Sequence, residues 1–284
     1  MTLSILYRGK LSGCNYDCPY CPFAKHRDSR ETLAADARDL DRLVAFVQSR
    51  TDIRFRLLFT PWGEALIRRH YQQALTVLSY LPNVDRVAIQ TNLSCRLGWL
   101  KHVNKQTLAL WTTYHPGQVQ REVFLSQCRQ LDELGITYSV GIVGFKETIE
   151  EIETMRGLLL AGTYLWVNAL KKVADYYNDH ERERLLAVDP FVGYNMVHHE
   201  SKGKACRAGE TVVSVDGEGN VYRCHFIKEK LGNLYETDIL QLLAPKPCTN
   251  DTCGCHIGYV HMPHLGLDEV YQGRELERVV VRLH

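Results

Sequence analysis

Three cysteines within eight residues near the start of the chain, Cys14, Cys18 and Cys21, constrain this sequence more than any other feature. Their C-x3-C-x2-C spacing places three soft thiolates in one loop. Three thiolates can hold three corners of an iron–sulfur cube, which normally takes four cysteines. The iron without a protein ligand is then free to bind another molecule. The spacing therefore predicts an iron–sulfur site with one open position.

Two other uses of these cysteines fit less well. Structural zinc usually has four nitrogen or sulfur ligands and pairs of the C-x2-C kind, and the nearby His26 would complete such a site only with a distorted spacing. A disulfide framework belongs to small secreted domains rather than to a chain of this length. The cysteine spacing thus favours an iron–sulfur cluster.

Composition limits the function classes. The 284 residues are 45% hydrophobic and 24% charged with a net charge of +1, as in an ordinary globular protein. A nearly neutral chain has no strong field to attract nucleic acid or an anionic membrane. No secretory signal is visible, and the apolar stretch 158–170 is too short to cross a bilayer. Since the chain nevertheless has ten cysteines, we expect a cytoplasmic, metal-binding protein without nucleic-acid or membrane partners.

Strand and helix patterns alternate over the first 170 or so residues. Helical stripes of apolar residues separate the strand-like runs; one contains Leu40, Leu43, Val44 and Val47, and another runs from Val123 to Leu134. This alternation predicts βα units around a parallel sheet, whose ligands bind at the carboxyl ends of the strands. The strand-like runs are Leu3–Tyr7, Phe55–Thr60, Arg86–Gln90, Leu108–Thr113, Ile136–Val143 and Tyr164–Leu170.

The cysteine spacing, with the aromatic Tyr20 directly before Cys21, resembles the radical S-adenosylmethionine (radical SAM) superfamily. The resemblance implies a partial (β/α)6 barrel over roughly residues 1–172. It also implies a 4Fe-4S cluster whose open iron chelates SAM and, once reduced, cleaves it to a 5′-deoxyadenosyl radical. Tyr20 is then expected beside this cofactor.

The turn after the second predicted strand carries Gly63 and Glu64. It resembles the family's Gly-Gly-Glu-Pro motif, which binds the amino group of SAM, although Trp62 replaces the first glycine and Ala65 the proline. A carboxylate and backbone carbonyls are the acceptors that an ammonium group needs. The resemblance implies that Gly63 and Glu64 bind SAM; a turn glycine followed by a solvated glutamate is the alternative.

The ends of the third and fourth predicted strands carry further matches. Thr91 and Asn92 resemble the family's Thr-Asn-Gly segment, although such residues also serve ordinary turns. Thr113 stands where the family has a serine that contacts the ribose or carboxylate of SAM. His115 follows, and we expect it to line the substrate pocket as a catalytic residue or to be a hydrogen-bonded structural histidine.

The fifth and sixth predicted strands complete the resemblance. Gly141 and Gly144 match the G-x-I-x-G-x-x-E segment that packs near the adenine of SAM, so Gly144 is expected to contact the cofactor. Glycine inside a strand usually marks a close backbone approach, and tight packing of helix on sheet would use the same glycines. Asn168, near the end of the sixth strand, is expected to touch the adenine.

The last third of the chain carries a second group of cysteines. A C-x12-G-x4-C pattern, a Gly-Asn segment and a terminal C-x4-C-x-C resemble the SPASM/twitch domains of radical SAM enzymes. Five cysteines can complete one four-thiolate cluster but not two, so the shorter, twitch-like form with one auxiliary 4Fe-4S cluster is expected. Structural zinc stays an alternative, because thiolate sites accept either metal. The candidate ligands are Cys206, Cys224, Cys248, Cys253 and Cys255, of which Cys253 or Cys255 would be the fourth.

These patterns predict a division into a radical SAM core over residues 1–172, a connecting segment over 173–205, and a twitch-like domain with a tail over 206–284. Within the last part, strands at 211–215 and 221–223 flank a glycine-rich hairpin turn. A unit this small has little core, so a metal would stabilise it. Cys128 falls on the apolar stripe of its helix and is expected in the core.

The expected function is a radical SAM enzyme that makes a net oxidative change to a small polar metabolite. An auxiliary cluster near the site would accept the leftover electron, and a donor such as flavodoxin or ferredoxin would reduce the first cluster. The barrel begins at residue 1, which favours a small molecule over a peptide held by an upstream domain. A peptide-modifying enzyme and a non-catalytic zinc-binding module are the alternatives.

Overall fold

The computed structural model describes residues 1–23, 26–171 and 173–281. Its first part alternates strands and helices, and each of the six predicted strands is present within two residues of its predicted ends. The strands are β1 (Thr2–Arg8), β2 (Arg54–Phe59), β3 (Val84–Thr91), β4 (Leu108–Thr113), β5 (Thr137–Gly144) and β6 (Leu165–Ala169). The longer helices between them are α1 (Arg30–Ser49), α2 (Arg69–Tyr80), α3 (Arg121–Leu134) and α4 (Ile149–Leu158).

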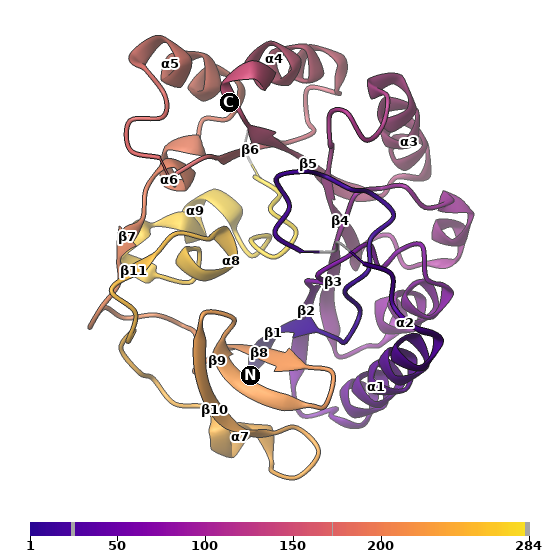
Figure 1. Cartoon of the computed structure of the whole chain (residues 1–284). Helices are drawn as coiled ribbons and strands as arrows, with labels where there is room; N and C mark the ends of the chain where they lie inside the picture. The colour runs from indigo at the N-terminus through magenta and orange to yellow at the C-terminus, as the bar shows by residue number, and fades with distance from the viewer. Residues whose placement is uncertain (24–25, 172, 282–284) are drawn as a thin grey trace.

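The six strands are parallel neighbours in sequence order, from β1 to β6. Their apolar residues are nearly continuous because both faces are covered, as parallel sheets require. Helices α1 to α4 lie along the outside of the curved sheet, as Figure 1 shows. The predicted α/β class and mostly parallel sheet are thus confirmed.

The inner face of the barrel is filled by the end of the chain. Inward side chains such as Leu6, Leu58 and Trp111 form one buried cluster with Leu276 and Val280 of the C-terminal segment. Polar contacts fix this segment in the half of the barrel where the strands begin: Ser139 donates to the Glu277 carbonyl, and Arg86 pairs with the Glu277 carboxylate at 3.1 Å. A ligand site would therefore lie in the other half of the barrel, where the strands end.

The last third of the chain adds strands to the same sheet. Strand β8 (Val212–Asp216) pairs in parallel with the other edge of β1, and β9 (Asn220–Cys224) and β10 (Ile227–Asn233) follow antiparallel, so the order is β10-β9-β8-β1-β2-β3-β4-β5-β6. The predicted hairpin is β8–β9. The domain division stays a prediction: its boundary at Lys172 and its last residues, 282–284, lie outside the described residues.

Short elements complete this part. Strands β7 (His199–Glu200) and β11 (Thr252–Cys253) pair with each other, and helices α8 (His256–Tyr259) and α9 (Leu267–Tyr271) pack on the barrel interior through Tyr259 and Tyr271. The connecting helices are α5 (Asp179–Val188), α6 (Val192–Met196) and α7 (Ile239–Leu242), and three-residue to six-residue 3-10 turns are η1 (Leu97–His102), η2 (Lys146–Thr148) and η3 (Pro263–Leu265).

Two sequence expectations need correction. Val123 does not share the buried face of α3: its side chain is 51% exposed, and Phe124, Leu125, Cys128 and Leu131 are buried instead. The face is turned by one residue because Phe124 packs against Tyr114. Strand β10 was not expected, since its Lys-Glu-Lys run has no apolar alternation; it forms because β9 offers it an edge. Cys128 is in the core as predicted.

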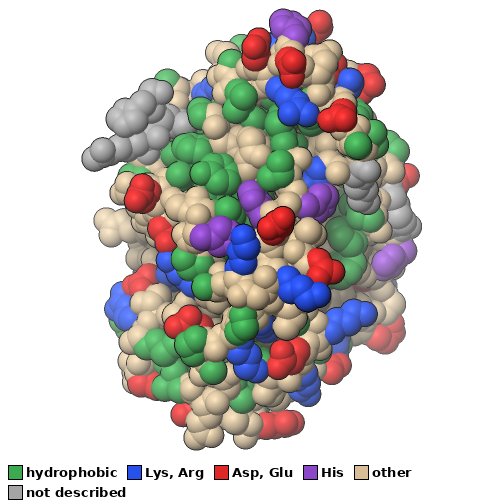
Figure 2. Space-filling model, turned by 90° about the vertical axis from the view of Figure 1, so that its left-hand side faces the viewer, with side chains coloured by type: hydrophobic (Ala, Val, Ile, Leu, Met, Phe, Trp, Pro, Cys, Tyr) green, Lys and Arg blue, Asp and Glu red, His purple; other side chains and the backbone are tan. Residues whose placement is uncertain are grey.

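Charged side chains of both signs are mixed over the face that carries β7 and β11, with histidines among them (Figure 2). This mixture agrees with the net charge of +1. Within the described part of the chain, no helix has both the length and the apolar character needed to pass through a membrane.

Candidate functional site

The loop that carries Cys14, Cys18 and Cys21 begins where β1 ends, and hydrogen bonds fix its first turn. The Asp28 carboxylate accepts from the backbone N–H groups of Ser12, at 3.1 Å, and Gly13, at 2.8 Å. This cysteine loop therefore leaves the sheet in one defined direction.

Gly63 brings the turn after β2 into contact with the cysteine loop. A Cβ atom at this position would overlap the carbonyl group of Gly13, the residue before Cys14. The next N–H, that of Glu64, donates to the same Gly13 carbonyl at 3.2 Å. The glycine of the predicted SAM motif is thus required by packing of backbone on backbone.

The Glu64 carboxylate is buried, with 2% of the residue exposed, and joins two strand ends. It accepts from the Leu66 N–H at 2.8 Å, from the Thr91 hydroxyl at 2.8 Å and from the Asn92 N–H at 2.5 Å. Burial raises its pKa to about 7, against the opposing effect of these donors. The alternative of a solvated glutamate is wrong, and SAM binding by Glu64 stays a prediction.

The turn after β3 also contacts the cysteine loop. The Asn92 side-chain amide donates to Asn15 at 3.1 Å and lies 3.8 Å from the Cys14 sulfur, and Asn15 in turn donates to Ser94 at 2.9 Å. Asn92 therefore holds both the cysteine loop and Glu64, while Thr91 holds Glu64 alone. These bonds go beyond the ordinary turn role that the sequence left open for them.

His115, at the end of β4, packs against the cysteine loop. Its Nδ1 lies 2.8 Å from the Tyr20 hydroxyl and 3.5 Å from the Cys18 sulfur, and the His115 and Tyr20 rings are stacked. Burial lowers the pKa of His115 to about 4, so the ring is neutral and shares one hydrogen bond with the Tyr20 hydroxyl. His115 and Tyr20 thus fix the loop from the β4 side.

The three other predicted SAM residues lie at the carboxyl ends of β4, β5 and β6. Thr113 and Asn168 share strand faces with Trp111 and Trp166, whose side chains point into the barrel. A Cβ at Gly144 would lie 2.7 Å from Val167 and 2.9 Å from the Tyr177 hydroxyl, so packing explains this glycine. Contact of all three with SAM stays a prediction.

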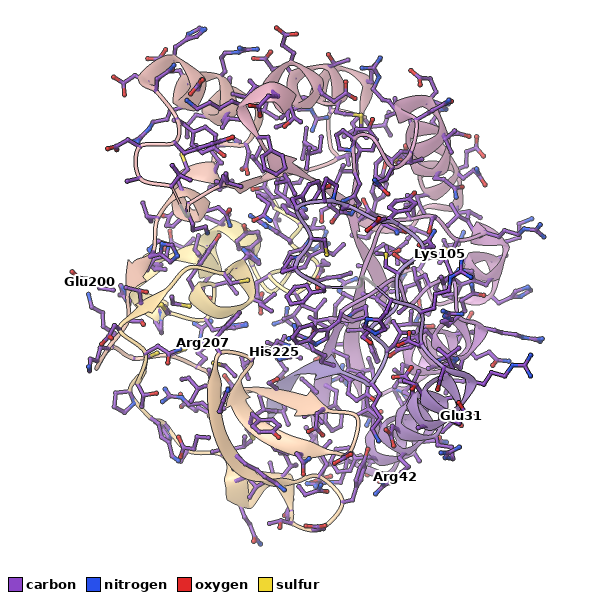
Figure 3. The ribbon with its side chains drawn as sticks, viewed as in Figure 1. Glu31, Arg42, Lys105, Glu200, Arg207 and His225 are labelled. Atoms are coloured by element: carbon purple, nitrogen blue, oxygen red, sulfur yellow. The ribbon has the colours of Figure 1, made fainter. Side chains whose placement is uncertain are left out.

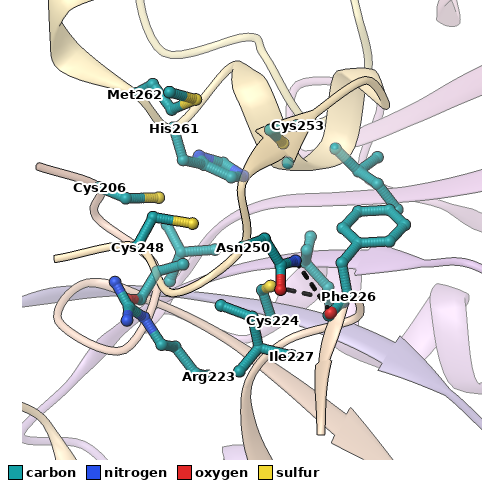
Figure 4. Close-up of a pocket in the computed structure, with 15 residues that line it drawn as sticks. Cys206, Arg223, Cys224, Phe226, Ile227, Cys248, Asn250, Cys253, His261 and Met262 are labelled. Carbon is teal, nitrogen blue, oxygen red and sulfur yellow. Dashed lines mark hydrogen bonds between the residues drawn. The ribbon is translucent and has the colours of Figure 1, made fainter. Parts of the chain in front are cut away.

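Four of the five C-terminal cysteines line one pocket. Cys206, Cys224, Cys248 and Cys253 surround a small space with a cavity volume of about 20 Å³, as Figure 4 shows. The fifth, Cys255, is exposed and is absent from the described lining of this pocket. The structure thus groups Cys253, rather than Cys255, with the other three.

The thiols of this four-cysteine pocket affect one another. Burial raises the pKa of Cys253 to about 12, and Cys224, Cys255, Cys206 and Cys248 all add to the shift. Partly buried thiols that lie close together are hard to ionise together unless a bound metal supplies positive charge. Among the described residues, no three His, Cys, Asp or Glu side chains meet closely enough to hold one metal ion. Four thiols around one space are a donor set that fits an iron–sulfur cluster and also a structural zinc ion.

Arg223 holds three cysteine segments together, and sequence reasoning missed it. Its guanidinium donates to the carbonyls of Ala208, at 2.9 Å, of Pro247, at 2.5 Å, and of Lys246. These carbonyls lie near Cys206 and Cys248, while Arg223 itself precedes Cys224. Its side chain is almost fully buried. The only sign of this role in the sequence was an arginine at an inward-facing position of a predicted strand, where an apolar residue is usual.

His261 and Lys171 adjoin the four-cysteine pocket. His261 is buried in its lining, burial lowers the pKa of the ring to about 4, and its Nε2 has no hydrogen-bond partner among the described residues. Lys171, after β6, donates to the Gly254 carbonyl between Cys253 and Cys255, and burial lowers its pKa to about 8. The barrel and the second cysteine group thus contact each other directly.

Comparison with solved structures supports the fold described above. Searches with family models and against curated proteins found no match. Among solved structures, anSMEcpe with bound AdoMet has 16% identity and a TM-score of 0.55, covering 85% of this chain and 83% of its own. The same enzyme with AdoMet and the Cp18Cys peptide has 15% identity and the same TM-score of 0.55, covering 86% and 82%.

Both are structures of a radical SAM enzyme with a SPASM/twitch domain. The chain has the radical SAM fold. BtrN in complex with AdoMet and 2-DOIA has 18% identity and covers 84% of this chain and 81% of its own, but its TM-score of 0.37 does not indicate the same overall arrangement. The resemblance drawn from the cysteine spacing is confirmed at the level of the fold.

Replacing Gly63 with alanine should displace the cysteine loop, because the new methyl group overlaps the Gly13 carbonyl. We expect the variant to keep its far-ultraviolet circular dichroism but to bind clearly less iron at the first cysteine site. Gly98→Ala is the matched control, since nothing lies within 4 Å of its Cβ position. Equal iron contents in the two variants would contradict this role.

Replacing Arg223 with methionine should loosen the four-cysteine pocket, because three backbone carbonyls lose their donor. A buried hydrogen bond to a charged group contributes about 1.5–3 kcal/mol, so we expect a lower unfolding temperature and loss of metal from this site. Arg223→Lys should recover only part of the stability, since an ammonium cannot match the planar fork. Metal content after anaerobic reconstitution and thermal unfolding measure both effects.

Proposed function

We propose that this chain is a radical SAM enzyme and that Cys14, Cys18 and Cys21 hold a 4Fe-4S cluster with one open iron. The observation that carries the proposal is the fixation of the cysteine loop by the ends of β2, β3 and β4, through Gly63, Asn92 and His115. A cysteine loop with a purely structural role would not need contacts to three successive strand ends at the ligand-binding edge of the sheet.

When bound and reduced, such a cluster supplies the electron that splits SAM into methionine and a 5′-deoxyadenosyl radical, which removes a hydrogen atom from a C–H bond. The residues of this chain would position SAM. The turn that the buried Glu64 holds would present its backbone carbonyls to the amino group, and Thr113 would contact the ribose or carboxylate. Gly144 and Asn168 contact the adenine, and Tyr20 packs beside the cluster.

We propose that Cys206, Cys224, Cys248 and Cys253 hold an auxiliary 4Fe-4S cluster. Their grouping around one pocket supports this, as does the Nε2 of His261 in its lining, which has no partner within the described residues and could donate a hydrogen bond to the cluster. A second cluster next to the barrel can accept an electron from the substrate, which favours a net oxidation. An external donor such as flavodoxin or ferredoxin would reduce the first cluster.

The proposed substrate is a small polar metabolite. A peptide is the second candidate, and one observation favours it: a similar structure, anSMEcpe, is bound to AdoMet and the Cp18Cys peptide. The test is anaerobic incubation with SAM, a reductant and each class of substrate, followed by mass spectrometry. The true substrate class is the one that gives a product that has lost hydrogen. A zinc-binding module without catalysis would contain zinc, lack sulfide and leave SAM intact.

Replacing Cys14, Cys18 and Cys21 together with alanine should remove one cluster and abolish formation of 5′-deoxyadenosine. Anaerobically reconstituted wild type should hold about eight irons and the triple variant about four. Iron and sulfide analysis and chromatography of the SAM products measure both results. SAM cleavage at the wild-type rate by the triple variant would overturn the proposal.

The variants Cys253→Ala and Cys255→Ala show which of the two cysteines is the fourth ligand of the auxiliary cluster. Because Cys253 lines the four-cysteine pocket and Cys255 is exposed, Cys253→Ala should lose about four irons and Cys255→Ala almost none. Both variants should still cleave SAM, since that chemistry belongs to the barrel. The opposite pattern of iron loss would assign the fourth position to Cys255.

A further inference from the structure

A cavity of about 590 Å³ opens at the carboxyl end of β1, between the barrel and the β8–β10 strands. Its volume lies in the range of small-molecule sites. The lining comes from the end of β1, the turn after β2, and β8 to β10. Its residues are Arg8, Gly9, Trp62, Ser214, Val215, Asp216, Tyr222, Cys224, His225, Ile227 and Lys228.

This cavity, called the Arg8 cavity below, lies between the two cysteine sites. Cys224 and Ile227 line both it and the four-cysteine pocket. On its other side, Trp62 precedes Gly63, which touches the cysteine loop, and the Trp62 ring packs edge-on against Phe23 at 4.3 Å between centroids. A molecule in this cavity would adjoin both proposed clusters.

Two polar side chains of the lining already form their hydrogen bonds within the protein. The Asp216 carboxylate accepts from the N–H groups of Glu218 and Asn220 at 2.9 and 3.0 Å and from the Asn220 amide at 2.9 Å, so it caps the hairpin turn. His225 uses both ring nitrogens, at 2.5 Å from the Ser214 hydroxyl and 2.9 Å from the Thr60 hydroxyl. These two residues shape the cavity.

The protonation state of His225 follows from its partners. The Thr60 hydroxyl donates to the Tyr7 carbonyl at 3.2 Å, so it can only accept from His225 Nε2. Nδ1 is then the bare nitrogen and accepts from Ser214. With both ring nitrogens bonded to hydroxyl groups, His225 leaves Arg8 and Lys228 as the positively charged side chains of the described lining.

Arg8 supplies that charge. It shares the strand face of Leu6, which points into the barrel, and its guanidinium carbon lies 5.0 Å from the centre of the Trp62 ring. Its Nε donates to the Thr60 carbonyl at 2.9 Å, and no carboxylate within the described ranges lies at ion-pair distance. Burial lowers its pKa. A half-buried guanidinium without a counter-ion gains free energy when an anion binds.

We propose that Arg8 binds a carboxylate or phosphate group of the substrate, with Lys228 as the second cation of the cavity; this assignment rests on the proposed radical SAM function. The predicted SAM residues Thr113, Gly144 and Asn168 lie on β4 to β6, whereas Arg8 lies on β1 beside β8. The anion site is therefore on the other side of the cysteine loop from the adenine position. The proposal narrows the substrate to an acidic small molecule or an acidic peptide group.

The test uses the anaerobically reconstituted full chain and three probes: glycerol 3-phosphate, glutarate and uncharged glycerol. Calorimetric titration should show binding of one or both anions and none of glycerol. Arg8→Gln should weaken anion binding by about tenfold or more, the size of one lost charge-assisted hydrogen bond. Arg8→Lys should recover part of the affinity.

Two matched controls separate this site from general charge. Arg42→Gln removes another guanidinium that lies over an aromatic ring, at 4.0 Å from the centre of Tyr235, but Arg42 lies on α1 and is absent from the described lining of the Arg8 cavity (Figure 3). Lys230→Gln removes an exposed charge from β10, as a control for Lys228→Gln. Neither control should change anion affinity.

Equal anion affinity in wild type and Arg8→Gln would overturn the proposal. A parallel loss of SAM affinity in Arg8→Gln would also overturn it, since the anion would then be the SAM carboxylate. Formation of 5′-deoxyadenosine by wild type, measured in the same preparations, tests the proposed function separately. Anion binding at Arg8 in a protein that never cleaves SAM would keep the anion site and reject its role in a radical SAM substrate pocket.

Discussion

The contact between the backbones of Gly13 and Gly63 fixes the geometry on which the proposed chemistry depends. It brings the residue before Cys14 against the turn after β2, at a distance that admits no side chain. Glu64 extends the same contact to the end of β3, because its buried carboxylate accepts from Thr91 and Asn92. The cysteine loop is therefore held by backbone atoms and buried groups, which move less than exposed side chains.

The pairing of β8 with the free edge of β1 has a different consequence. It places the strand hairpin that leads to Cys224 next to the strand that leads to the cysteine loop. The cavity that Arg8 and His225 line thus shares Cys224 with the four-cysteine pocket and includes Trp62 from the turn that touches the cysteine loop. A separate C-terminal unit joined by a linker would not create this cavity. This geometry would place the proposed auxiliary cluster beside the proposed substrate, as electron transfer between them would require.

Much of the barrel site could be predicted because its signals are local or repeat along the chain. The C-x3-C-x2-C spacing predicts a first metal site by itself, and strand ends that follow one another in a parallel sheet must meet at one edge. Thr113, Gly144 and Asn168 could be placed at that edge from the order of the strands alone. Arg8, Arg223 and His225 could not, since each is a polar residue in or beside a strand without a motif around it. Their roles depend on the carbonyls, rings and hydroxyls that distant segments bring to them.

The sequence by itself determined the α/β alternation, the division of most cysteines into two groups and the edge of the sheet where the first group lies. These follow from periodicity and spacing, which act over a few residues. Only the tertiary structure decided that Cys253 joins Cys206, Cys224 and Cys248 while Cys255 stays exposed, that the C-terminal segment fills the barrel, and that Arg8 faces a cavity without a carboxylate partner among the described residues. Those outcomes depend on which buried surfaces pack together across the chain, and spacing along the sequence does not specify such long-range packing.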